Sequence, residues 1–238
     1  MEINYFFRTI YDIGFTRILG RLKHELKKYS YKYIPSRLLL KISNTDFKTS
    51  FYKRSLENLS LLNSNFYERT IIPNQIRFDF LNEPKVLKCP IQWNSRKHNQ
   101  LWRFNLHYFD WAREWLEIKY REGNWPKESK YLKFFINDWV SNNRIGVGDG
   151  WHSYTISIRV RNWILLFNAC PELLNEKNLS SLWHQICWLN FNKEDYLGGN
   201  HWLENLITLI IGSLHFQGNR AKSIFQKSFR ALEDELKK

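Results

Sequence analysis

The segment GGNHWLENLITLIIGSL, residues 198–214, indicates how this chain folds. After two glycines, apolar side chains recur every three or four residues. That spacing places them along one side of an α-helix. They are Leu203, Leu206, Ile207, Ile210, Ile211 and Leu214. The segment therefore predicts an amphipathic helix that begins directly after a glycine turn.

Apolar stripes with the same spacing occupy four earlier segments, which are 108–116, 132–140, 156–167 and 179–187. Short breakers containing glycine or proline separate the stripes. Connections this short force neighbouring helices to run antiparallel. From about residue 107 onward we therefore expect six helices in three antiparallel hairpins, ending with a helix over 219–237. The predicted fold class is all-α.

The first thirty residues predict a basic amphipathic helix, with Ile18, Leu22 and Leu26 on its apolar side. A helix that lies on a membrane surface has the same pattern. Apolar residues on the other faces, such as Ile13 and Phe15, instead favour a helix docked on the rest of the domain.

Residues 44–100 contain three prolines and only short mixed runs. They predict extended and looped chain, with one helix near 53–63. We expect a single domain over 1–238, with an N-terminal helix and irregular region over 1–100 and the helical hairpins over 101–238.

The composition is that of a globular protein, with 43% hydrophobic and 25% charged residues. The net charge of +13 indicates a polyanionic partner, and nucleic acid, anionic lipid and acidic polysaccharide all satisfy that requirement. The 17 Phe, 12 Tyr and 11 Trp provide apolar area for helix packing and flat faces for stacking on sugars or bases. Composition therefore indicates a polyanion without choosing among these three classes.

No run approaches the roughly 20 apolar residues of a transmembrane helix. Arg8 and Asp12 interrupt the apolar N-terminus before any cleavage site for a secretion signal, so a cytoplasmic location is the default expectation. The three cysteines, Cys89, Cys170 and Cys187, form no CxxC pair and are expected to be reduced.

Three segments interleave polar and aromatic residues beside the apolar stripes, namely LWRFNLHYFDW (101–111), GWHSYTISIRVRNW (150–163) and GGNHWLENL (198–206). A purely structural interpretation fits the first and third, with Asn105 and Asn200 as helix caps. In the second, Tyr154, Ile158, Arg161 and Asn162 share one helical side, distinct from the stripe through Val160 and Trp163.

Several classes of enzyme lack support. The sequence contains no GxGxxG, no GxxxxGK[ST], no GxSxG and no HExxH. None of the seven histidines stands at metal-ligand spacing from a second histidine or a cysteine. We therefore expect neither a cofactor nor a metal.

In this order and spacing, LWRFNLHYFDW, WHSYTISIRVRNW and GGNHWLENLITLIIGSLHFQG resemble the N-terminal domain of heparinase II/III-type polysaccharide lyases. The resemblance runs from roughly residue 70 to the last residue. It implies an incomplete (α/α) toroid that binds an acidic polysaccharide, joined in full-length members to a β-sandwich domain. Relatives of this kind are often periplasmic or secreted.

The resemblance also implies a reaction, β-elimination at a uronic acid. In that reaction a base takes the C5 proton, the carboxylate is neutralised, and an acid protonates the departing oxygen. Asn200 matches the neutralising residue, and His201 matches a histidine beside it. The groove-lining residues implied by the two other motifs are His107, Tyr108, Trp151, His152, Tyr154 and Arg159.

In that family the catalytic tyrosine follows the next helix, beyond the last residue here. We therefore expect this polypeptide to bind glycan but to show little activity alone, with a separately encoded C-terminal half as a candidate partner. The first alternative is a non-catalytic glycan-binding or scaffold protein. A nucleic-acid-binding helical protein is the second, and the dispersed basic residues and the lack of a known nucleic-acid module count against it.

Overall fold

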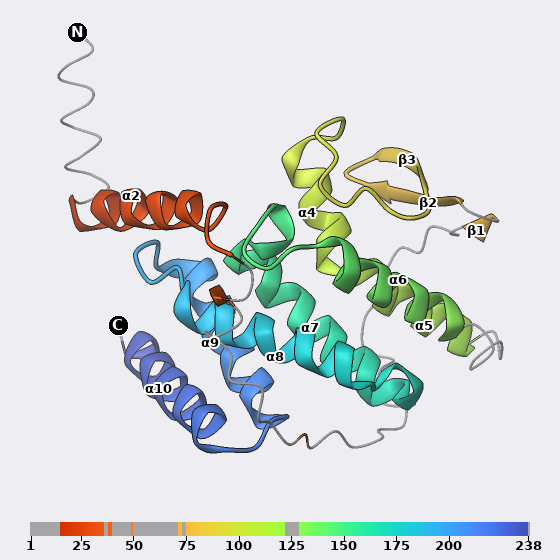
Figure 1. Cartoon of the computed structure of the whole chain (residues 1–238). Coiled ribbons are helices and arrows are strands. Elements are labelled where there is room, and N and C mark those ends of the chain that lie inside the picture. The colour runs from red at the N-terminus through yellow and green to blue at the C-terminus, as the bar shows by residue number, and fades with distance from the viewer. Residues whose placement is uncertain are drawn as a thin grey trace, which may run out of the picture.

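The computed structural model describes residues 15–35, 38–39, 49, 71–72, 75–121 and 129–237 (Figure 1). This part of the chain is mostly helical, as expected. Its α-helices are α2 (Phe15–Ser30), α4 (Gln100–Tyr108), α5 (Asp110–Arg121), α6 (Ser129–Asn142), α7 (Ser153–Ala169), α8 (Glu176–Phe191), α9 (Gly199–Leu214) and α10 (Asn219–Leu236). Two short 3-10 helices, η2 (Asp149–Trp151) and η3 (Pro171–Leu173), precede α7 and α8.

The six helices predicted after residue 107 correspond to α5 through α10. Helix α9 packs along α10, and α7 packs along α8. Helix α6, however, packs against α8 and η3 rather than chiefly on α5. Helix α7 also packs along α9, two helices later in the sequence. The structure therefore confirms the predicted helices, while their arrangement in three successive hairpins stays a prediction.

The stripe predicted over 108–116 is interrupted in the structure. Phe109 adopts the left-handed conformation, with φ of 62°, and separates α4 from α5. Its ring stays in the core and packs against Trp93, Trp111 and Trp163. The N-cap of α4 is Asn99, whose Oδ1 accepts from the Trp102 amide at 2.7 Å. Asn105 is therefore not a cap, and its side chain donates to the Leu101 carbonyl within α4.

Helix α7 is the centre of the fold (Figure 1). It contacts α4, α5, α8 and α9, so most of its surface is covered. The predicted stripe through Ile156, Val160, Trp163 and Phe167 is fully buried. A helix covered on several sides positions its polar residues rigidly, because little room remains for movement.

A small antiparallel sheet lies where extended and looped chain was expected. Its strands are β1 (Ile71–Ile72), β2 (Gln75–Phe80) and β3 (Glu83–Lys88), in that order. Leu81 and Asn82 join β2 to β3 with φ of 58° and 59°, as in a tight hairpin turn. Phe78 and Phe80 pack their rings on Trp111 and Trp102, which fixes the sheet on α4 and α5.

The N-terminal helix is confirmed over Phe15–Ser30, whereas residues 1–14 and the helix predicted near 53–63 lie outside the described residues. All three cysteines are free. Within the described ranges, no helix is both long enough and apolar enough to cross a membrane.

Replacing Phe78 with alanine should lower the free energy of unfolding by about 3–5 kcal/mol, since its ring is fully buried between the sheet and α5. Val86 on β3 is 58% exposed, so Val86→Ala should change stability by no more than about 0.5 kcal/mol. Urea unfolding of the two variants measures both values. An equal loss of unfolding free energy in the two variants would contradict a sheet that packs on the helices through its β2 side chains.

Candidate functional site

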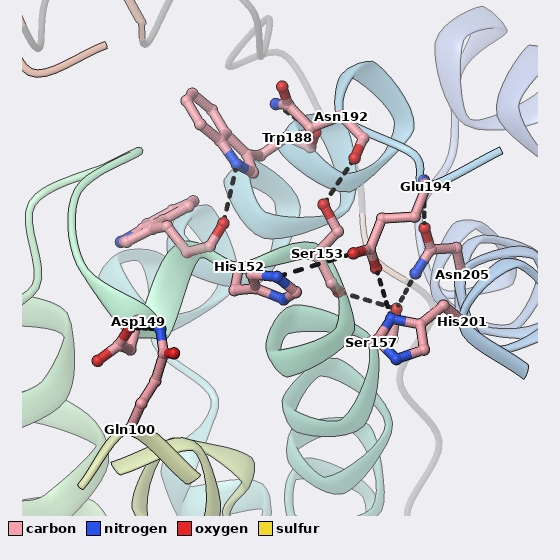
Figure 2. Close-up of polar contacts among 11 residues, drawn as sticks. Gln100, Asp149, His152, Ser153, Ser157, Trp188, Asn192, Glu194, His201 and Asn205 are labelled. Carbon is pink, nitrogen blue, oxygen red and sulfur yellow. Dashed lines mark hydrogen bonds and ion pairs between the residues drawn. The ribbon is translucent and has the colours of Figure 1, made fainter. Parts of the chain in front are cut away.

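Two histidines meet one buried carboxylate where α7 and α9 begin (Figure 2). His152 precedes α7, and its side chain does not cap the helix. Its Nε2 instead lies 3.7 Å from Oε1 of Glu194, while Nδ1 of His201 lies 3.3 Å from Oε2. We call His152, Glu194 and His201 the His–Glu–His cluster.

Glu194 is held in place from its backbone. Its amide donates to Oδ1 of Asn205 at 2.9 Å, and Nδ2 of Asn205 donates to Oγ of Ser157 at 3.0 Å. Only 1% of the Glu194 side chain is exposed, and the two imidazoles are among the groups that its carboxyl meets. An ionised carboxylate only accepts hydrogen bonds, so against that form of Glu194 the His201 ring donates from Nδ1.

Two tyrosines extend the cluster. The ring of Tyr154 packs on His201 with 4.4 Å between centroids, and its other neighbour is Tyr108 at 6.1 Å. Burial, followed by the charge of Glu204, raises the pKa of Tyr154. Burial also raises the pKa of Tyr108, with Tyr154 and Asp110 as further causes. Both phenols are therefore neutral at pH 7 and keep a proton that a hydrogen bond to a ligand requires.

A groove of about 680 Å³ opens beside Tyr154. Helices α4, α5, α7 and α9 form its walls. The lining residues are Asn105, Tyr108, Asp110, Arg113, Tyr154, Ile158, Arg161, Asn162, Ile164, Leu165, Asn168, Ile211, Leu214 and His215. The sequence predicted that one side of α7 carries Tyr154, Ile158, Arg161 and Asn162. All four residues line the groove, so this side of α7 faces it.

Two arginines supply positive charge to the groove. Arg161 pairs with Glu204 of α9, and Arg113 lies 4.0 Å from both Asp110 and Glu117. The Arg161 side chain is 29% exposed, so it remains accessible to a ligand. A guanidinium binds carboxylate or sulfate groups through paired hydrogen bonds.

Asn200 and His201 lie in the first turn of α9. The N-cap is Gly198, and Gly198 and Gly199 have φ of 64° and 57°, in the left-handed region that favours glycine. Asn200 is therefore not the cap, which corrects the structural interpretation of this motif. Its side chain is exposed at the helix N-terminus, where the backbone favours negative charge. Neither residue lines the groove itself, and Tyr154 stands between His201 and the groove.

Three of the expected groove residues are buried in the core instead, which corrects that expectation for His107, Trp151 and Arg159. Trp151 packs against Trp139 and Trp188. His107 accepts from the Trp139 indole, and burial, followed by Arg159, lowers its pKa well below the usual range. It is therefore neutral at pH 7.

Arg159 connects four elements. Its Nη1 donates to the His107 carbonyl of α4 at 3.2 Å, and its Nη2 to the Gly150 carbonyl of η2 at 2.6 Å. Its Nε donates to Oε1 of Gln185 in α8 at 2.8 Å. The guanidinium carbon lies 4.0 Å from the Trp139 ring centroid. These contacts fix η2, which directly precedes His152.

Glu194 was not predicted from the sequence. It stands six residues before Asn200 in an acidic, lysine-containing stretch that is typical of an exposed loop. Its proximity to the GGNH segment was the only available signal. In the described part of the chain, no group of three or more His, Cys, Asp or Glu side chains is arranged to hold a metal ion.

Arg159→Leu should lower the free energy of unfolding by about 3–5 kcal/mol, because two carbonyls and the Gln185 amide lose a charged donor inside the core. Arg161→Leu, two residues along the same helix, removes a partly exposed ion pair and should cost less than about 1 kcal/mol. Urea unfolding separates the two outcomes. Similar small losses would mean that Arg159 does not hold these elements together.

Comparison with protein-family models, with curated proteins and with solved structures found no match to this chain. We therefore infer its function from the geometry of the site and from the three motifs that form it.

Proposed function

We propose that this chain is the helical domain of a heparinase II/III-type polysaccharide lyase, an incomplete (α/α) toroid whose groove binds a uronic-acid-containing polysaccharide. One observation carries the proposal. Tyr154 both lines the groove and packs on His201, so a ligand in the groove meets a side chain that is in direct contact with the His–Glu–His cluster. Asn200 stands beside His201 at the same helix end.

The chemistry of the groove suits an acidic sugar. Arg113 and Arg161 provide donors for carboxylate or sulfate oxygens. Tyr108 and Tyr154 provide phenol donors, and their rings offer faces on which sugars stack. The net charge of +13 attracts a polyanion over a longer range. These features support binding of an acidic glycan, with or without cleavage.

Cleavage by elimination assigns a role to each site residue. Asn200 and the N-terminus of α9 neutralise the uronate carboxylate, which acidifies the C5 proton. A base removes that proton, the C4–C5 double bond forms, and the bond from C4 to the departing oxygen breaks. The departing oxygen takes a proton from an acid. The Tyr154 phenol, which lines the groove, is the proton-transfer group at the sugar, and His201 packs behind it. Glu194 orients the His201 ring and also meets His152.

Glycan binding should depend on Arg161. Arg161→Gln should weaken binding of alginate, hyaluronan or heparan sulfate roughly ten- to hundredfold, because a charged donor is lost. Glu204→Gln should leave affinity unchanged or raise it, since it removes the carboxylate that competes for Arg161. Titration calorimetry on the full chain at two salt concentrations measures both effects.

Arg230 on the exposed side of α10 is the matched control, and Arg230→Gln should leave affinity unchanged. Equal losses for Arg161→Gln and Arg230→Gln would indicate diffuse attraction by the net charge and contradict a binding groove. Complete displacement of glycan by double-stranded DNA at equal charge would favour the nucleic-acid alternative.

Turnover by this chain should be slow. The raised pKa of Tyr154 makes its phenolate scarce at neutral pH, so few molecules carry this side chain in the form that takes the C5 proton. Ultraviolet absorbance of the unsaturated uronate product reports the reaction. Rapid product formation that Asn200→Ala abolishes would overturn the expectation of slow turnover and support the assigned site. Absence of both product and salt-sensitive binding would contradict the proposal as a whole.

A further inference from the structure

Helix α2 touches the rest of the molecule along one narrow face. Gly20 lies against Tyr196 so closely that a Cβ at this position would overlap that side chain. His24 packs on the same ring with 5.4 Å between centroids. One and two turns later, Lys27 donates to the Phe191 carbonyl at 2.8 Å and Tyr31 donates to Oδ1 of Asn192 at 2.8 Å. These positions repeat every three or four residues and form the docked face.

The opposite side of α2 carries an exposed apolar stripe. At 3.6 residues per turn, its members project about half a turn away from the docked face. The stripe consists of Leu19, Leu22, Leu26 and Tyr29 of α2, and Tyr33 in the turn after the helix extends it. Leu26 and Tyr33 are each 71% exposed. The two phenols of Tyr29 and Tyr33 hydrogen-bond to each other at 3.0 Å on this outer side. Five large apolar residues on one outward face form a continuous patch, which monomeric proteins rarely expose without a partner.

Basic side chains border this stripe on both sides. Arg21 and Lys32 lie along one edge and Lys23 lies along the other, and all three are exposed. The helix sequence FTRILGRLKHELKKYS contains a single acidic residue, Glu25. An apolar stripe with basic borders and terminal tyrosines matches the physical requirements of a helix lying in the plane of an anionic lipid surface.

We propose that α2 binds the surface of an anionic lipid bilayer, with the stripe inserted among the upper acyl chains and Arg21, Lys23 and Lys32 against the phosphates. The tyrosines suit the boundary between headgroups and acyl chains, because each has an apolar ring and a polar hydroxyl. Anchoring α2 in this way would hold the domain at a membrane surface.

A second copy of the chain fits this surface less well. A symmetric dimer through the stripe would bring the basic borders of the two copies together, and like charges at an interface oppose association. Five side chains on one helix also provide less area than the roughly 800 Å² per partner of a standard interface. An anionic bilayer satisfies both the apolar stripe and its charged borders.

The test is flotation of the full chain with large unilamellar vesicles of phosphatidylcholine and phosphatidylglycerol, alongside vesicles of phosphatidylcholine alone. The chain should float with the anionic vesicles, and less so at high salt. The double variant Leu22→Ser/Leu26→Ser should reduce the partition coefficient roughly tenfold or more, because two exposed leucines no longer enter the bilayer. Arg21→Gln and Lys23→Gln should each reduce it about fivefold.

The matched control is Leu101→Ser/Leu236→Ser, which removes two equally exposed leucines from α4 and α10 and should float like the unmodified chain. Failure of the unmodified chain to float with anionic vesicles overturns the proposal. Equal flotation of Leu22→Ser/Leu26→Ser and the unmodified chain also overturns it. A lipid-free dimer that Leu22→Ser/Leu26→Ser abolishes, without flotation, would replace the bilayer with a second copy.

Discussion

The buried guanidinium of Arg159 is the constraint on which the arrangement around α7 depends. A charge in the core is costly unless every donor is satisfied. Each of the three Arg159 side-chain nitrogens donates to a partner, which is a backbone carbonyl of α4, a backbone carbonyl of η2 or a side chain of α8. Those three elements must therefore meet α7 at fixed positions. Because η2 runs directly into His152, the same constraint sets where the cluster begins.

The candidate site combines a buried, hydrogen-bonded carboxyl at Glu194 with an open groove beside Tyr154. Glu194 is buried and held through Asn205 and Ser157, so the two imidazoles meet a fixed carboxylate (Figure 2). Tyr154 then joins this fixed cluster to the groove and its two arginines. In the proposed function, this fixed cluster supports proton transfer beside a groove that contains two arginines, as acid–base chemistry on an anionic sugar requires. The proposed lyase function rests on this adjacency.

The helices could be predicted from the sequence because burial of a helix face leaves a period in the apolar residues. The sheet could not, since β2 and β3 are short and their packing on Trp102 and Trp111 appears only in three dimensions. Arg159 was assigned to the groove from the resemblance of the WHSYTISIRVRNW motif to the lyase family. Its place three residues after Ile156 and four before Trp163, on the buried side of α7, was the sign of its actual role. No apolar period marks Glu194 as buried in the sequence, because its burial depends on contacts with residues of α7 and α9.

Hydrogen–deuterium exchange of the full chain, with and without a uronic-acid oligosaccharide, tests the central claim most directly, because it locates the ligand without assuming turnover. Protection should appear in residues 105–113, in the first three turns of α7 and at the N-terminus of α9, where the groove and the His–Glu–His cluster adjoin. The outer helices α2 and α10 should exchange as before. Protection confined to α2 or α10, or no protection at saturating oligosaccharide, would contradict a glycan site in this groove.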